Sequence, residues 1–188
     1  MEARDVPSQA VARGCSEQIA VAALESREAL ARLYATHAPQ LYRYFWIHTR
    51  CHSLAEDLVS ETFLSAMRSL RAYRPERGSF NAWLYGIAHH VLAQHARLDG
   101  PVRADGRVLD ALPDDSSSHL EERIDLWQAV SELDGADREL LALKFGAELT
   151  HPQIAEITGL EPGYVGVLLY RALQKLRIRL MGEEGGHG

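Results

Sequence analysis

Nine histidines and two cysteines give this 188-residue chain side chains that could bind a metal ion. His48, Cys51 and His52 have the most suggestive spacing, because positions i, i+3 and i+4 lie on one face of a helix. Three further histidines could supply a fourth ligand: His89, His90 and His95. However, no HExxH, CxxC or glycine-rich phosphate loop accompanies them, and no nucleophile, base and orienting group have interpretable spacing. We therefore expect no metal site, no cofactor and no enzymatic activity.

A second group of residues could bind single-stranded nucleic acid. Cations and aromatic rings alternate around the turn-forming segment RPERGS: Arg68, Arg71, Tyr73, Arg74, Arg77 and Phe80. Cations neutralise phosphates, and unstacked bases can lie on rings. Ser79 and Asn81 add polar groups that could read a base. The alternative is that Phe80 belongs to the core and the arginines to an ordinary surface, and we expect Trp83 to be buried.

Acidic and apolar residues lie together before this turn. On a helix, Glu56, Asp57 and Glu61 share one face. Leu58 and Phe63 lie beside them and could anchor a partner protein. This combination fits a basic helical partner. The alternative is that the acids only solvate the helix and favour its N-terminal end.

The C-terminal part has the spacing of a helix-turn-helix. Thr150 can cap a short helix, Gly159 can end it, and Pro162 can begin a long one. The motif needs a small residue for close helix contact at its fifth position and a buried anchor at its fifteenth, and these positions hold Ala155 and Val165. This segment therefore predicts a DNA-binding module.

Apolar residues recur at helical spacing elsewhere, and no strand-like alternation competes, so we predict an all-α fold. Two helices split near Pro39 come first. A third begins with a capping box at Ser53 and runs to about Leu70, and a fourth begins near Ser79. The third helix is expected to turn one stripe inward: Leu54, Leu58, Phe63, Leu64 and Met67.

The distribution of charge divides the chain. The net charge is −6, but residues 27–98 carry nine basic and five acidic groups, whereas 99–137 carry three and eleven. Segment 99–119 is also rich in Gly, Pro, Asp and Ser, which indicates a flexible acidic linker between two small helical domains. The predicted division is an N-terminal extension (1–25), a first domain (26–98), the linker (99–119), a helix-turn-helix domain (120–181) and a disordered tail (182–188).

The composition predicts a folded protein without a membrane span. Hydrophobic residues make up 46% of the chain, yet no apolar run approaches the ~20 residues that cross a bilayer. The first residues lack the basic-then-apolar order of a secretion signal, so the expected location is the cytoplasm.

Two segments of the chain resemble a known family, the extracytoplasmic-function (ECF) group of bacterial RNA polymerase sigma factors. AEDLVSETF and AWLYGIA are similar to segments of the family's first domain, and ELLALKFGAELTHPQIAEITGLEPGYVGVLLYRALQKLR is similar to its last domain. The resemblance covers about two thirds of the chain in the family's order. It implies a transcription initiation factor whose partners are core RNA polymerase, promoter DNA and an anti-sigma factor.

The resemblance also implies roles for residues. Those implied to bind core polymerase are Glu56, Asp57, Leu58, Glu61 and Phe63. Those implied to bind the minus-ten element, as duplex and as melted strand, are Arg71, Tyr73, Arg74, Arg77, Ser79, Phe80, Asn81, His89, His90 and Arg97. Those implied to bind the minus-thirty-five element are Thr150, Tyr164, Tyr170, Arg171 and Lys175.

The chain departs from the family pattern at two places. His89 and His90 stand where relatives have Arg-Asn, so upstream duplex contacts should be weaker and could depend on pH. Gly166 and Leu168 stand where the recognition helix has cations, which removes bidentate guanine readout. DNA binding through phosphates and a protein partner for the apolar surface are both open.

Competing functions follow from these departures. A sigma-like module could bind polymerase or a regulator without reading a promoter, and an ordinary helix-turn-helix repressor would bind duplex DNA alone. The acidic linker could imitate nucleic acid in basic polymerase channels or serve as a solubilising tether. The preferred function is promoter recognition, minus-ten strand opening and transcription initiation with core polymerase.

Overall fold

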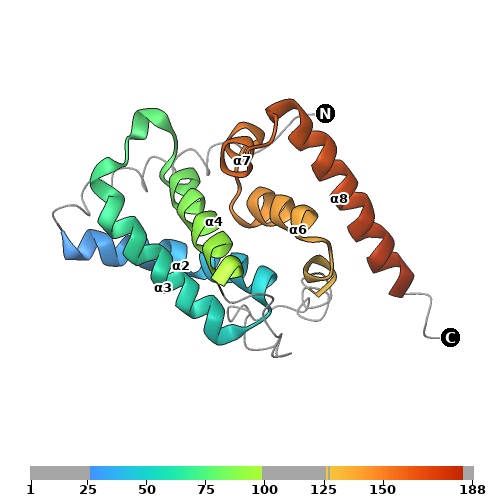
Figure 1. Cartoon of the computed structure of the whole chain (residues 1–188), viewed down its shortest axis with the longest axis horizontal. Helices are drawn as coiled ribbons and strands as arrows, with labels where there is room; N and C mark the ends of the chain where they lie inside the picture. The colour runs from blue at the N-terminus through green and yellow to red at the C-terminus, as the bar shows by residue number, and fades with distance from the viewer. Residues whose placement is uncertain (1–25, 99–125, 127, 184–188) are drawn as a thin grey trace, which may run out of the picture.

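The computed structural model describes residues 26–98, 126 and 128–183. These residues form helices and no strand, which confirms the all-α prediction. Figure 1 shows two groups of helices that lie side by side: α2, α3 and α4 in one, α6, α7 and α8 in the other. The predicted extension 1–25 and linker 99–119 lie outside the described residues, and the predicted domain boundaries stay predictions. No helix in the described part of the chain is long and apolar enough to cross a membrane.

The first group contains three long helices: α2 (Arg27–Thr49), α3 (His52–Ser69) and α4 (Phe80–Leu98). Ser26 caps α2 by accepting a hydrogen bond from the amide of Ala29 at 3.3 Å. The predicted break near Pro39 is wrong, because α2 continues through this residue. Leu33 and Leu41, on either side, are buried, and their packing offsets the hydrogen bond that proline cannot donate.

The start of α3 also differs from its prediction. Cys51 is the N-cap residue, and Ser53 lies inside the first turn without capping the helix. The predicted end near Leu70 is confirmed, because α3 gives way there to two 3-10 turns, η1 (Leu70–Ala72) and η2 (Pro75–Arg77). The predicted start of α4 is confirmed as well, since the Ser79 Oγ accepts from the amide of Ala82 at 3.2 Å.

The second group contains a helical stretch at 128–131, α6 (Gly135–Leu141), the π-helical turn η4 (Ala142–Gly146), α7 (His151–Thr158) and α8 (Pro162–Glu183). The predicted helix-turn-helix is confirmed. Thr150 and Gln153 form a capping box, and Gly159 ends α7 with a φ of 72°, a left-handed conformation that favours glycine. Ala155 and Val165 are buried where α7 and α8 meet. α8 continues to Glu183, into the predicted tail.

Candidate polymerase and nucleic-acid interface

The outward face of α3 carries the predicted acidic residues together with exposed apolar side chains. Glu56, Asp57 and Glu61 are exposed, and Leu64 and Met67 beside them are 53% and 48% exposed. We call these five residues the α3 ridge. Leu64 and Met67 were expected to point inward, which is wrong. Positions 57, 61 and 64 are four and three residues apart, a spacing that places them on one face and could have revealed the ridge.

Two residues predicted for the same contact are buried instead. Leu58 and Phe63 are only 2% and 6% exposed, because they pack in the core between the helices. The ring of Phe63 lies 4.6 Å from that of Tyr34 on α2. These two side chains therefore hold α3 in place and cannot serve as the apolar anchor, a position that Leu64 and Met67 occupy.

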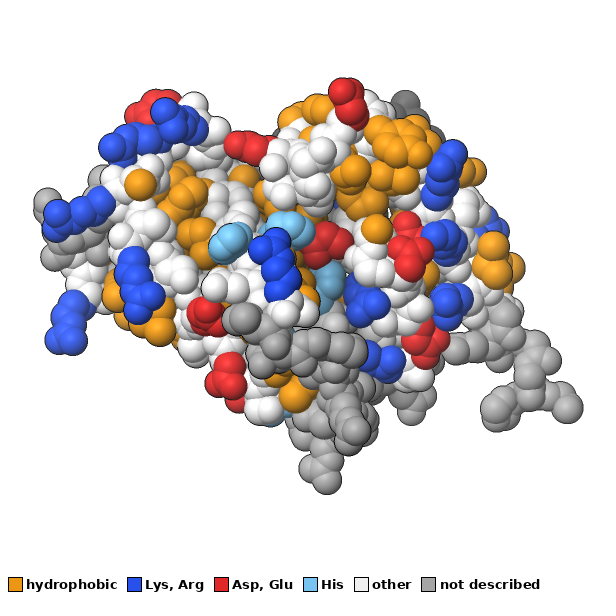
Figure 2. Space-filling model, in the orientation of Figure 1, with side chains coloured by type: hydrophobic (Ala, Val, Ile, Leu, Met, Phe, Trp, Pro, Cys, Tyr) orange, Lys and Arg blue, Asp and Glu red, His pale blue; other side chains and the backbone are white. Residues whose placement is uncertain are grey.

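The loop between α3 and α4 presents cations, while its rings are buried. Arg71, Arg74 and Arg77 are exposed, as predicted from the sequence. Figure 2 shows Lys and Arg side chains gathered over this loop. Tyr73 and Phe80 are 6% and 2% exposed, and their rings pack edge to face at 5.6 Å. The prediction that a base stacks on these two rings is therefore wrong for this arrangement, because both surfaces are covered.

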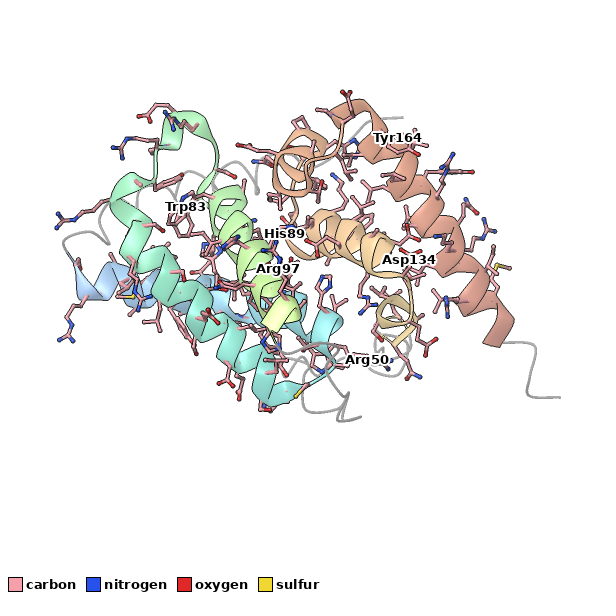
Figure 3. All side chains as sticks on the ribbon, viewed as in Figure 1. Arg50, Trp83, His89, Arg97, Asp134 and Tyr164 are labelled. Atoms are coloured by element: carbon pink, nitrogen blue, oxygen red, sulfur yellow. The ribbon has the colours of Figure 1, made fainter. Side chains whose placement is uncertain are left out.

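Trp83, unlike Tyr73 and Phe80, is accessible at the surface. It is only partly buried, and it lines a cleft of about 660 Å³ together with Arg74, Arg77 and His90. Figure 3 shows Trp83 on α4 below the loop. The sequence prediction that placed Trp83 wholly in the core missed this. Ser79, Trp83 and His90 recur at a helical spacing of four and seven residues, a signal that could have found this face.

The exposed face of α8 begins with aromatic and apolar side chains. Tyr164, Val167 and Tyr170 are 45%, 44% and 63% exposed, and Figure 3 shows Tyr164 at the start of the helix. The Arg171 guanidinium donates to the Tyr164 hydroxyl at 3.4 Å. Thr150 is also exposed, at the start of α7. The predicted minus-thirty-five surface is thus rich in rings and carries Arg171, and sequence reasoning did not include Val167.

Protein-family models match both groups of helices. Sigma-70 region 2 matches residues 33–100, and Sigma-70, region 4 matches residues 123–176. The RNA polymerase sigma factor CarQ of Myxococcus xanthus is 32% identical over 84% of this chain and 92% of its own. The chain belongs to the sigma-70 family. The ECF sigma factor BldN of Streptomyces coelicolor is also 32% identical, over 79% of this chain and 59% of BldN, and the ECF group is confirmed.

Solved structures support the same fold for this sigma factor. CnrH, solved in complex with the cytosolic domain of CnrY, matches 90% of this chain and 97% of its own with a TM-score of 0.62 and 25% identity. The sigma factor RpoE of Bartonella quintana, solved with the anti-sigma factor NepR, matches 80% of this chain and 96% of its own with a TM-score of 0.65. At 21% identity, the second likeness concerns the fold alone.

The two helical groups of the sigma factor are joined by contacts that involve predicted minus-ten residues. The Asn81 amide donates to the carbonyl of Ala147 at 2.6 Å, and the Gln153 amide donates to the Ser79 Oγ at 2.9 Å. Glu156 of α7 lies on the wall of the cleft that Trp83 lines. In this closed arrangement, the polar groups of Ser79 and Asn81 are engaged by the second group of helices.

Lys175, predicted to contact the minus-thirty-five element, is paired with two carboxylates. Its ammonium pairs with Asp137 and, at 2.8 Å, with Asp134 at the N-terminus of α6. These hydrogen bonds raise the pKa of Lys175, and the bond from Lys175 lowers the pKa of Asp134 to about 2. The predicted DNA contact from Lys175 would have to break this pairing. Arg171 has no such carboxylate partner among the described residues.

A buried carboxylate lies between the two groups of helices. Glu139 of α6 is 8% exposed, and its Oε1 accepts from the Tyr44 hydroxyl at 2.8 Å. His48 Nε2 lies 2.9 Å from Oε2, and His89 Nδ1 lies 2.9 Å from Oε1. We call these four residues the Glu139 cluster. Burial alone would raise the pKa of Glu139, but the close polar contacts with His48 and His89 lower it to about 2.

The cluster changes the expected roles of two histidines. His89, predicted to contact DNA, faces Glu139 from α4, and Figure 3 shows it on the side toward α6. The hydrogen bond to Glu139 raises the pKa of His89 against the effect of burial. His48, considered as a metal ligand, also faces Glu139. Among the described residues, no three His, Cys, Asp or Glu side chains are placed to share an ion. His90 and Arg97 remain exposed.

Proposed function

We propose that this sigma factor binds core RNA polymerase through the α3 ridge and opens the minus-ten region of promoters with the cleft beside it. The observation that carries the proposal is that α3 bears the ridge and also forms one wall of the cleft. α3 presents the ridge to solvent, while Ser65 and Ser69, on another side of the same helix, line the cleft. Binding polymerase through the ridge would therefore fix the cleft relative to the polymerase.

The proposed docking contact is electrostatic and apolar. Three exposed carboxylates, from Glu56, Asp57 and Glu61, lie along α3 before the exposed side chains of Leu64 and Met67. A basic helical surface of polymerase would pair with the carboxylates and cover the apolar pair, which has no cover within the described chain.

The proposed strand capture combines cations with one ring. Arg74 and Arg77 would neutralise phosphates of the melted non-template strand, and a base would stack on Trp83 at the cleft wall. Arg71, His90 and Arg97, all exposed, would add contacts to the backbone. The opening is driven by binding energy and requires no covalent chemistry, so the protein is proposed to have no enzymatic activity. Its proposed place of action is the cytoplasm, where core polymerase meets the chromosome.

The proposed minus-thirty-five contact uses the start of α8. Tyr164, Tyr170, Arg171 and Thr150 would contact the duplex there, with phosphates providing most of the affinity because Gly166 and Leu168 supply no cation. An anti-sigma factor is a further proposed partner. The solved complex of RpoE contains an anti-sigma factor, and this chain shares its fold.

The proposal is tested by capture of random single-stranded DNA. Holoenzyme reconstituted from this chain and core polymerase should retain a defined set of sequences, whereas core polymerase alone should not. Holoenzyme with Trp83→Leu should retain far less DNA while its assembly is unchanged. Equal retention by core polymerase alone would contradict the proposal.

A further inference from the structure

We propose that the Glu139 cluster is a proton-sensitive latch that holds the two helical domains of this sigma factor together. The latch itself rests on the geometry of the free protein. Its consequence for promoters rests on the function proposed above.

The cluster joins elements that are distant in sequence. Glu139 belongs to α6, Tyr44 and His48 belong to α2, and His89 belongs to α4. All three partners of the carboxylate therefore come from the other domain. Separating the domains would leave the carboxylate without any of them, and a buried charge that loses its partners is strongly destabilised until water reaches it.

The surroundings of the carboxylate contain few other charges. On its own helix, Asp137 is paired with Lys175, and Arg138 donates to the carbonyls of Ile47 and His48 at 3.4 Å. Arg138 thus adds a second link between α6 and the end of α2. The cleft beside the cluster, about 460 Å³ in volume, has mostly apolar walls that include Leu92, Leu140, Leu160 and Leu168. Among the described residues no lysine or arginine contacts Glu139, whose polar partners are Tyr44, His48 and His89.

The direction of the pH effect follows from the two shifts. The pKa of His89 is raised in the closed arrangement, so protonated His89 stabilises that arrangement. This stabilisation is complete below the ordinary histidine pKa of about 6.5 and is lost as pH rises through the raised pKa. The pKa of Glu139 is lowered from 4.5 to about 2, so the ionised carboxylate stabilises the closed arrangement. This stabilisation is complete above pH 4.5 and is lost as pH falls toward 2. The latch is therefore tightest between about pH 4.5 and 6.5 and weakens on the alkaline side.

While the latch is closed, two polar side chains predicted to read DNA are hydrogen-bonded to the second domain. When it is closed, Asn81 is bonded to Ala147 and Ser79 to Gln153. Opening would release both polar groups and would remove Glu156 from the wall of the Trp83 cleft. A partner that separates the domains must therefore break the cluster, and it would do so with less cost when His89 is neutral.

The test measures the distance between the domains in the full free chain, without polymerase or DNA. Dyes on Ser60→Cys of α3 and Arg177→Cys of α8, both exposed positions, report domain separation by single-molecule energy transfer after Cys15→Ser and Cys51→Ser. The closed-to-open ratio should fall as pH rises from 6 to 9, by at most tenfold per pH unit because His89 releases one proton. A ratio that is constant over this range, or that rises, would overturn the proposal.

Variants assign the effect to the cluster. His89→Gln should remove most of the pH dependence, whereas His90→Gln, the neighbouring histidine that is exposed and outside the cluster, should keep it. Glu139→Gln, which keeps the shape but loses the charge, should also give a flat profile. Unchanged pH dependence in His89→Gln, or its loss in His90→Gln, would contradict the latch. Neither result would affect the proposed binding of core polymerase, which the capture experiment tests separately.

Discussion

Reversing two charges of the α3 ridge, Asp57→Arg with Glu61→Arg, should abolish association with core polymerase. Both carboxylates are exposed and therefore interact through water. At a separation of about 4 Å in a water-like dielectric, one ion pair contributes about 1 kcal/mol. Reversal replaces that attraction by a repulsion of similar size, so the loss is about 2 kcal/mol per position and about 4 kcal/mol for the pair. The dissociation constant should rise about a thousandfold.

The fold should tolerate these substitutions. Neither side chain is buried, and surface changes of this kind usually alter the free energy of unfolding by about 0.5 kcal/mol. Asp57 lies beyond the first turn of α3, where the effect of the helix dipole has largely fallen off, so its reversal adds little to this cost. A thermal melt should therefore show a folded protein at the assay temperature.

The assay is binding of labelled sigma factor to core polymerase at two salt concentrations. The matched control is Glu28→Arg with Glu148→Arg, which reverses two exposed carboxylates outside α3. The control variant should bind core polymerase like the unaltered chain. Raising the salt concentration should weaken the binding of both proteins, because salt screens charges beyond about 10 Å. Undiminished binding by the ridge variant would refute the assignment, as would an equal loss in the control.

Three further predictions concern the cleft and the helix-turn-helix. Trp83→Leu should reduce opening of the minus-ten region by roughly tenfold, because a stacked base contributes about 1–3 kcal/mol, while core binding stays unchanged; a permanganate footprint that is equally strong would contradict this. Gly159→Ala should lower the free energy of unfolding by about 1–2 kcal/mol, since φ is 72°, whereas Gly163→Ala should not; equal melting temperatures for the two variants would be the contrary result. Arg171→Ala should weaken promoter binding by the holoenzyme more than Lys175→Ala, because Lys175 is held by Asp134 and Asp137, and a filter-binding titration that gives the reverse order would count against the described pairing.

The parts of the fold that depend on local chemistry could be predicted from the sequence. Thr150, Gly159 and Val165 act within one short motif, where capping, a left-handed turn and a buried anchor have fixed spacing. The acidic face of α3 was predictable for the same reason, because neighbouring turns of a helix decide which side chains lie together.

The errors arose where contacts between distant segments decide the outcome. Pro39 was expected to end a helix, but packing on both sides of it keeps α2 continuous. Tyr73 and Phe80 have the composition of a base-stacking loop, yet they pack on each other in the core. Lys175 is 41 residues from Asp134, and Glu139 is 95 residues from Tyr44, so no local spacing indicates either contact.

The central claim, that the α3 ridge and the Trp83 cleft together make this chain a promoter-opening factor, is tested most directly by transcription in vitro. Core polymerase and the purified chain are incubated with a library of random promoters, and the transcripts are sequenced. The account predicts transcripts from a distinct class of promoters with a shared minus-ten element, and their loss with Asp57→Arg and Glu61→Arg. Binding of the chain to core polymerase without any transcript above the core-alone background would contradict it.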